Sequence, residues 1–208
     1  MSGVAAISRD TLRVAGLGLL LGYLLIERLY ELRLSARHAR ALRARGAVEH
    51  GRGHFPMLVA LHTAFPIALA TEVGLAIGSE RSATTPLAGW PLWLALFLGA
   101  QGMRRWAMRA LGEFWNVRVW VLPGASRIRR GPYRFLRHPN YVAVVVEFLA
   151  APLMFGAWRT AVAFSLMNLV ALAVRVRVEE RALTQAAAAH DPRPADAALP
   201  VPSTPRAG

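Results

Sequence analysis

The stretch RGPYRFLRHPNYVAVVVEFLAAPLMF, residues 130–155, sets a dense polar segment directly against a long apolar run. Between Val142 and Phe155 the only charged residue is Glu147. Pro132 and Pro139 disfavour helix for the residues before them. We therefore expect irregular backbone over residues 130–139 and a helix from about Asn140. So many polar groups at the mouth of a membrane segment cost free energy unless a polar ligand or partner contacts them.

The rest of the chain is also too apolar for an ordinary soluble domain of its length. Of its 208 residues 55% are hydrophobic, and the mean hydropathy is +0.34. Five apolar runs are candidate membrane spans: about Thr11–Tyr30, Phe55–Ile77, Leu87–Trp106, Tyr141–Phe155 and Arg159–Val176. Runs of this kind are typical of membrane helices. We predict an all-α polytopic membrane protein with about five transmembrane helices.

Only Gly156, Ala157 and Trp158 separate the last two apolar runs, which predicts a tight antiparallel helical hairpin. We expect one domain over residues 1–189. The Pro- and Ala-rich tail over residues 190–208 has no periodicity and is predicted to be disordered.

The basic residues are all arginine, and they give the chain a net charge of +13. They gather in the two connections after the first and third apolar runs, so anionic headgroups and topology explain them better than nucleic acid does. By the positive-inside rule these connections and the C-terminus are cytoplasmic and the N-terminus is outside. We expect an integral protein of a bacterial inner membrane. The absence of cysteine excludes disulfides and thiolate chemistry.

Several segments next to the spans carry expectations of their own. Arg13 and Arg28 flank the first apolar centre and can snorkel from its ends. Glu31–Arg52 is interpreted as a continuation of the first helix that lies near the membrane surface. Leu111–Ala125 alternates in part and predicts either a short ribbon or an extended segment on the bundle.

Three polar residues lie inside the apolar runs, where polar groups are costly. Asn168 is expected to hydrogen-bond between helices. Glu147 either faces a pocket or pairs with an arginine, and the sequence leaves both open. Glu72 is a similar case with less claim to function.

The fifth run ends in Arg175-Val-Arg-Val-Glu-Glu-Arg181, and the hairpin places this charged end beside His138. Helical spacing sets Arg175 and Glu179 on one stripe. The residues alone leave two interpretations. Either the charges are membrane anchors in solvated ion pairs, or they form a polar pocket at one edge of an apolar bundle.

Three motifs, in this order and spacing, decide between them: Gly131-Pro-Tyr133, Arg137-His-Pro-Asn-Tyr141 and Arg175-x-Arg-x-Glu-Glu180. Together they resemble the isoprenylcysteine carboxyl methyltransferase family, over about Leu111–Leu183. The resemblance implies a membrane-embedded methyltransferase that uses S-adenosylmethionine in a cytoplasmic pocket and takes a lipophilic substrate from the bilayer. It implies no metal site.

Carried over position by position, the resemblance assigns ten residues to the cofactor: Ser126, Arg127, Ile128, Tyr133, Arg137, His138, Pro139, Asn140, Tyr141 and Glu179. Arg137 is also a candidate headgroup anchor, as are Arg129, Arg130 and Arg134. The resemblance gives Arg175 the role of holding the substrate near the methyl donor. Glu180 is a candidate catalytic residue with Arg175, because a phenolic acceptor benefits from a base, and His138 and Glu179 are alternatives for that base.

The expected reaction is O-methylation of a carboxyl or phenolic hydroxyl group on a lipophilic molecule. A phenolic lipid or quinone is one hypothesis for the acceptor. Two other classes stay open on the sequence: an NADPH-dependent sterol-type reductase, which shares an Arg-His-Pro-x-Tyr run, and a non-catalytic lipid-binding membrane protein. The sequence does not indicate the oligomeric state.

Overall fold

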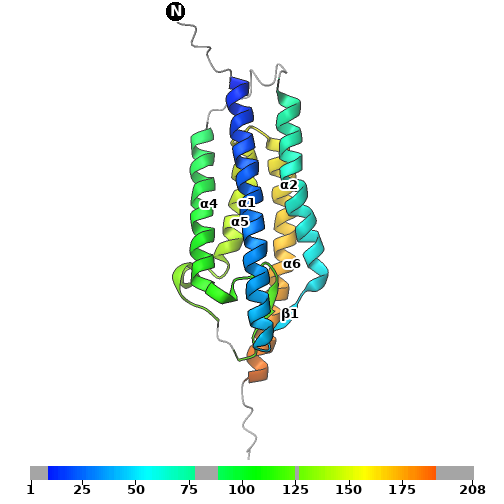
Figure 1. Cartoon of the computed structure of the whole chain (residues 1–208), viewed down its shortest axis with the longest axis vertical. Helices are drawn as coiled ribbons and strands as arrows, with labels where there is room; N and C mark the ends of the chain where they lie inside the picture. Colours follow the sequence, from blue (N-terminus) through cyan, green and yellow to red (C-terminus); the bar gives the residue numbers. More distant parts are fainter. Residues whose placement is uncertain (1–8, 78–88, 125–126, 191–208) are drawn as a thin grey trace, which may run out of the picture.

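The computed structural model describes residues 9–77, 89–124 and 127–190, and in this part of the chain five α-helices form an elongated bundle (Figure 1). The helices are α1 (Arg9–Ala44), α2 (Phe55–Ala76), α4 (Trp90–Leu111), α5 (Pro139–Leu153) and α6 (Trp158–His190). The predicted all-α class is therefore confirmed. The tail predicted to be disordered lies outside the described residues except for His190, which ends α6.

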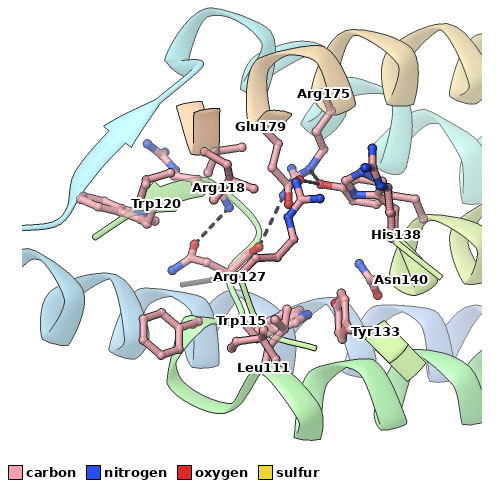
Figure 2. A pocket seen from close by; sticks show the side chains of 18 of the residues that line it. Leu111, Trp115, Arg118, Trp120, Arg127, Tyr133, His138, Asn140, Arg175 and Glu179 are labelled. Atoms are coloured by element: carbon pink, nitrogen blue, oxygen red, sulfur yellow. Dashed lines mark hydrogen bonds between the residues drawn. The ribbon is translucent and has the colours of Figure 1, made fainter. Parts of the chain in front are cut away.

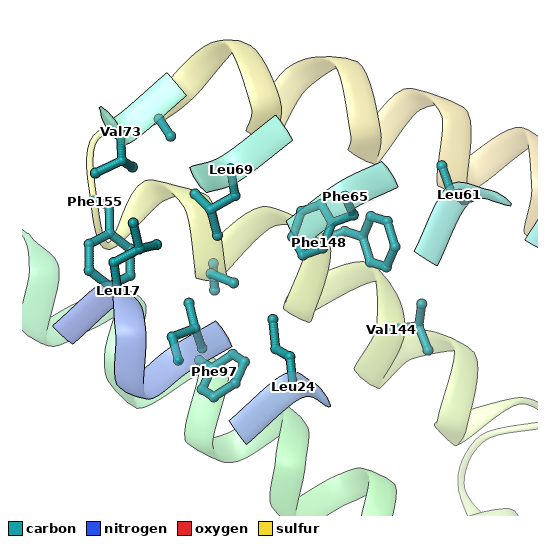
Figure 3. Close-up of a cluster of buried hydrophobic side chains, with 14 of the residues drawn as sticks. Leu17, Leu24, Leu61, Phe65, Leu69, Val73, Phe97, Val144, Phe148 and Phe155 are labelled. Carbon is teal, nitrogen blue, oxygen red and sulfur yellow. The ribbon is translucent and has the colours of Figure 1, made fainter. Parts of the chain in front are cut away.

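The helices meet along an apolar core that runs through the middle of the bundle (Figure 3). On α2 the buried residues Leu58, Leu61, Phe65, Leu69 and Val73 recur at spacings of three and four, which places them on one face. Phe65 stacks on Phe148 of α5, with ring centroids 4.4 Å apart. This core fixes how α2 and α5 pack and so where the lower ends of both helices lie.

The outer face of the bundle is also apolar. Leu19, Ile26, Ile67, Leu75 and Val170 are at least 63% exposed. Two helices, α2 with its preceding turn and α6, are long and apolar enough to cross a membrane by length and composition. Only 28% and 22% of their apolar windows are buried within the molecule. A helix in the core of a soluble protein would bury most of that surface, so lipid is the natural solvent for these faces.

The hairpin between α5 and α6 is confirmed. Residues 154–157 connect the two helices, and Gly156 adopts a positive φ of 68° there. Glu72 of α2 accepts hydrogen bonds from the backbone N–H groups of Arg159 and Thr160, at 3.1 and 2.7 Å. Glu72 therefore satisfies the free N–H groups at the start of α6, which is a structural reason for an acidic residue in an apolar helix.

The expectations for the two arginines of α1 were wrong. Arg13 is buried and donates a hydrogen bond to the carbonyl of Phe155, next to the hairpin turn. Arg28 donates to Glu31 at 2.6 Å and to Glu147 at 3.2 Å. Both side chains satisfy polar groups of the bundle rather than snorkelling to water.

Glu147 belongs to a buried ionic cluster. Arg104, 1% exposed, donates to Glu147 at 2.6 Å and to Glu31 at 3.2 Å. Gln101 donates to the same Glu147 oxygen from 2.8 Å. Of the two alternatives for Glu147, pairing with arginine is the one that the structure shows. A buried carboxylate is tolerated because these donors replace its hydration.

The prediction for Asn168 was wrong. The side chain is buried, but neither of its amide atoms has a hydrogen-bond partner in the part of the chain that the structure describes.

At the lower end in Figure 1 the chain departs from helix. The segment Glu31–Arg52 continues α1 only to Ala44, and the helix keeps its direction instead of turning along a surface. Val48–His50 then forms β1, which pairs antiparallel with β2, Val119–Val121. The ribbon predicted as one possibility for Leu111–Ala125 thus exists, with a partner strand that the sequence did not indicate. The connections between α1 and α2 and between α4 and α5 both lie at this end.

Candidate functional site

A cavity of about 550 Å³ lies at the lower end of the bundle, between the β2 segment, the start of α5 and the charged end of α6 (Figure 2). This volume is in the range of small-molecule sites. Three parts of the chain that are far apart in sequence meet here: residues 111–122, residues 127–141 and residues 175–183. The apolar stretch of α6 ends just before Arg175, so Arg175 and the charged residues that follow it on that helix lie beyond this stretch.

Gly131 fixes the turn that brings Tyr133 into the cavity. Its φ is +58°, a left-handed conformation that favours glycine. A Cβ built on Gly131 would lie 2.8 Å from the Cβ of Ala110 and 3.1 Å from Nε1 of Trp106, both on α4. Next to it, Arg130 donates to the carbonyl of Ala110 at 2.7 Å. Arg130 therefore joins the turn to the end of α4, where the sequence predicted only a headgroup anchor.

After this turn comes η3, a 3-10 helix over Gly131–Arg134, and α5 begins at Pro139. The predicted irregular backbone before α5 is confirmed, with the helix starting one residue before Asn140. Pro139 occupies the first turn of α5, where its missing N–H costs nothing. It is buried and outside the cavity lining, unlike its neighbours His138, Asn140 and Tyr141.

Tyr141 joins α5 to the charged end of α6. Its hydroxyl donates a hydrogen bond to Glu179 and accepts one from Nε of Arg175 at 2.7 Å. Arg175 also donates to the carbonyls of Val117, at 2.5 Å, and Asn116, at 3.4 Å. Three of its five N–H groups are used in this way, and two have no partner among the residues that the structure describes. Arg175 and Glu179 share a helix stripe as predicted, but they are linked through Tyr141.

Glu180 lies behind the cavity instead of in its lining. Both of its carboxylate oxygens accept from Nη2 of Arg127 at 2.8 Å, and Oε1 lies 2.9 Å from Nε2 of His138. The hydrogen bond from Arg127 has the largest effect and lowers the pKa of Glu180. Burial raises this pKa by less, and His138 lowers it further. Glu180 therefore holds the loop of Arg127 and the ring of His138 in place. The His138 ring in turn stacks on Tyr141 at 5.1 Å.

Tyr133 lines the cavity with its phenol protonated. Burial raises the pKa of Tyr133 above its ordinary value, and the charge of Glu179 raises it further. A neutral phenol is a hydrogen-bond donor with a polarisable ring face.

Of the ten predicted cofactor contacts, eight line the cavity: Arg127, Ile128, Tyr133, Arg137, His138, Asn140, Tyr141 and Glu179. Arg129 and Arg134, predicted as anchors, line it too. Ser126 lies outside the described residues. The predicted substrate residue Arg175 is also in the lining.

The sequence interpretation missed the segment after α4. Trp115, Asn116, Arg118 and Trp120 line the cavity from the side of β2. Arg118 pairs with Glu49 of β1 at 2.7 Å, so the ribbon holds it in place. The signal was present as two tryptophans, an amide and an arginine within six residues of an alternating segment. Aromatic and charged side chains interleaved in this way are a ligand-binding pattern.

Two buried polar atoms of the lining residues have no hydrogen-bond partner among the residues that the structure describes. They are Oδ1 of Asn140 and Nε1 of Trp120. Buried polar atoms are usually paired, so each exception needs an explanation. A bound ligand with one donor and one acceptor in suitable positions would satisfy both.

The comparisons with known proteins agree with this geometry. Residues 93–185 match the isoprenylcysteine carboxyl methyltransferase (ICMT) family, a range that covers α4 to α6 and so most of the cavity lining. The uncharacterized protein YpbQ of Bacillus subtilis (strain 168) is 34% identical over 167 residues, which span 80% of this chain and 96% of that protein. An uncharacterized protein of Haemophilus influenzae is 31% identical over 158 residues, or 76% and 88% of the two chains. No solved structure matches the chain.

The chain belongs to the isoprenylcysteine carboxyl methyltransferase family, as the motifs around His138 and Glu179 predicted. The family is membrane-embedded and uses S-adenosylmethionine. Membership favours the methyltransferase prediction over the sterol-type reductase.

Proposed function

We propose that this protein transfers a methyl group from S-adenosylmethionine to an oxygen atom of a lipophilic acceptor at the cytoplasmic face of a bacterial inner membrane. The observation that carries the proposal is the cavity in which Tyr133, Tyr141, Glu179 and Arg175 come together at the end of an apolar bundle. The family match supports the reaction class.

The side chains of the cavity fit the chemical groups of S-adenosylmethionine. Glu179 uses Oε2 for Tyr141, which leaves Oε1 for the ammonium group or a ribose hydroxyl. The arginines of the lining offer partners for the carboxylate. Trp115, Trp120 and Tyr133 present ring faces to adenine and to the sulfonium charge. The unpaired Oδ1 of Asn140 can accept from the adenine amino group.

The same placement supports the proposed cytoplasmic side of the site. The connections that carry the arginine-rich segments lie at the end of the bundle that holds the cavity. The positive-inside rule then puts this end, and with it the soluble cofactor, in the cytoplasm. The five helices would span the membrane. At 15 residues α5 is short for a membrane helix, and the helices packed against it would shield its ends from lipid.

Bound S-adenosylmethionine supplies an electrophilic methyl group on a sulfonium centre. The chain has to align an acceptor oxygen with that methyl group and keep water away, and alignment alone gives much of the rate. The two free N–H groups of Arg175 can hold the acceptor oxygen and favour its anionic form. A carboxylate acceptor needs nothing more.

A phenolic acceptor has a pKa near 10 and has to lose a proton. The structure offers a route through Tyr141. Its oxygen can accept the acceptor's proton while its own proton passes to Glu179, because the hydrogen bond to Glu179 already exists. Glu180 is not in the lining, and Arg127 and His138 already engage its carboxylate, so we assign it a positioning role.

The direct test is methyl transfer by the full chain in membranes, with radiolabelled S-adenosylmethionine and two acceptors, a long-chain carboxylate and a long-chain phenol. Base treatment hydrolyses a methyl ester and spares an aryl methyl ether, so it identifies the accepting group. Cofactor binding without transfer to any lipid extract or either acceptor would contradict the proposal.

Two variants test the assignment of residues. We expect Glu179→Ala to abolish cofactor binding, since it removes the carboxylate offered to the ammonium or ribose. We expect Arg175→Ala to bind cofactor and to lose turnover. Arg109→Ala, at an exposed position of α4 outside the cavity, is the matched control. Wild-type activity in both site variants would overturn the assignment.

A further inference from the structure

A second cavity of about 190 Å³ lies on the bundle side of the first. The two cavities share Trp115, Asn116, Asn140, Tyr141 and Arg175 in their linings. These residues therefore form the partition between the proposed cofactor site and the second cavity. An acceptor in the second cavity would meet Arg175 and Tyr141 at one end, as the proposed reaction requires.

The wall of the second cavity combines apolar and polar side chains. Leu58, Val144 and Leu172 are apolar lining residues, whereas Arg28, Glu31, Arg104 and His62 are polar and lie beyond the partition. A chamber that only held a hydrocarbon tail would gain nothing from polar groups at this depth. The ionic ones are explained, because Glu31 is paired with Arg28 at 2.6 Å and with Arg104 at 3.2 Å.

His62 is not explained by such pairing. Its Nδ1 lies 2.9 Å from the carbonyl oxygen of Leu58. A carbonyl can only accept, so Nδ1 carries the proton and Nε2 is an acceptor. Nε2 has no hydrogen-bond partner in the described part of the chain. The ring is held by an edge contact with Phe148, with centroids 5.1 Å apart.

His62 lies deeper in the bundle than the partition does. Tyr141 and Val144 line the cavity from α5, and Phe148, which contacts His62, is one turn further along that helix. His62 therefore lies one to two helical turns deeper than Tyr141, roughly 5–10 Å at the rise of an α-helix.

We propose that His62 recognises a second polar group of the acceptor: the methyl-accepting oxygen sits at Arg175, and an O–H or N–H donor on the far side of the same head group bonds to Nε2 of His62. The acceptor class is then an amphipathic molecule with two polar groups on one compact head and an apolar tail. This inference rests on the proposed methyl transfer and deepens it.

Two matched pairs of acceptors test the inference with the full chain. One pair is a long-chain alkylphenol and the matching alkylhydroquinone. The other is a benzoic acid with a long alkyl chain on the ring, without and with a hydroxyl group para to the carboxylate. In the pair that is methylated, we expect the member with the additional hydroxyl to have a KM about tenfold lower. A tenfold ratio corresponds to about 1.4 kcal/mol, the contribution of one hydrogen bond. The turnover number should differ little.

Variants at position 62 test whether His62 causes this preference. His62→Phe should make the two members equal, His62→Gln should keep part of the preference, and both should bind cofactor like the wild type. Thr71→Val is the matched control, because Thr71 is also on α2, bonds to the carbonyl four residues before it and lies outside both cavities.

Equal KM values in the wild type, or a preference that survives His62→Phe, would overturn the role of His62. Transfer to none of the four probes, with normal cofactor binding, would overturn the acceptor class as well. If the wild-type chain does not bind S-adenosylmethionine, this result would instead count against the proposed function itself.

Discussion

Nε of Arg175 lies 2.7 Å from the hydroxyl oxygen of Tyr141 and donates a hydrogen bond to it. Arg175 is near the middle of α6, just after its apolar stretch, and Tyr141 is at the start of α5, so this bond crosses from one arm of the hairpin to the other. It also lies in the partition between the two cavities. The residue proposed to hold the acceptor and the residue bonded to the proposed cofactor ligand Glu179 therefore cannot move independently.

Removing the hydroxyl of Tyr141 tests this coupling. Tyr141→Phe leaves Nε of Arg175 and one oxygen of Glu179 without their partner, and one such loss costs about 1–3 kcal/mol. We expect kcat/KM to fall at least tenfold, with the loss larger for a phenol than for a carboxylate if Tyr141 passes the proton. Steady-state kinetics with both acceptors measure it. Tyr30→Phe, at an exposed position of α1, should be neutral.

The turn at Gly131 should not tolerate a side chain. Gly131→Ala puts a Cβ 2.8 Å from that of Ala110 at a φ of +58°, and such strain costs about 1–3 kcal/mol. We expect a lower unfolding temperature and weaker cofactor binding, because the turn positions Tyr133. Gly99→Ala, where a Cβ meets nothing within 4 Å, is the control. Equal effects of the two changes would contradict the role of the turn.

The link from Arg127 to Glu180 predicts a pH dependence. The pKa of Glu180 is lowered in the folded chain, so its contribution is present above the unfolded value of about 4.3 and is lost as the pH falls through the folded value. Because the pair is partly exposed, we expect only about a threefold weaker cofactor affinity for Glu180→Gln at neutral pH.

Cofactor binding measured from neutral to acid pH checks this prediction. The difference between Glu180→Gln and the wild type should shrink only in acid, as the pH falls through the lowered pKa of Glu180 and the wild-type side chain becomes protonated. An unchanged affinity at neutral pH would show that the loop holds its place without Glu180.

The buried cluster around Arg104 should be the most sensitive point of the bundle. Arg104→Leu leaves Glu147 and Glu31 to share Arg28, so one buried negative charge is uncompensated, and breaking a buried pair in this way costs about 3–5 kcal/mol. Thermal unfolding in detergent should show a large fall in Tm for Arg104→Leu and little change for the exposed Arg109→Leu. The double variant Arg104→Leu/Glu147→Leu should recover part of the loss.

Local signals predicted much of this molecule. Apolar runs predicted the helices, and the short connection at Gly156 predicted the hairpin, because two helices joined by so few residues have to lie antiparallel. The proline at position 139 predicted where α5 begins. The order of the motifs around Tyr133, His138 and Glu179 was enough to predict the family.

Several predictions that were wrong or incomplete concern partners distant in sequence. Nothing near Glu147 in the chain indicates that Arg28 and Arg104 pair with it, and Val48–His50 does not by itself specify β2 as its partner. Glu179 and Glu180 are adjacent in a matched motif, yet the rotation of α6 takes one to the cavity and the other behind it.

The sequence by itself determined which segments are helical and apolar, because hydrophobic periodicity, proline and chain length act on neighbouring residues. Only the tertiary structure decided which side chains share a cavity, which charges are neutralised and how Arg175 and His62 come to lie in the wall of one chamber. These depend on how whole helices rotate and pack, where the burial of many side chains together outweighs the preference of any one of them.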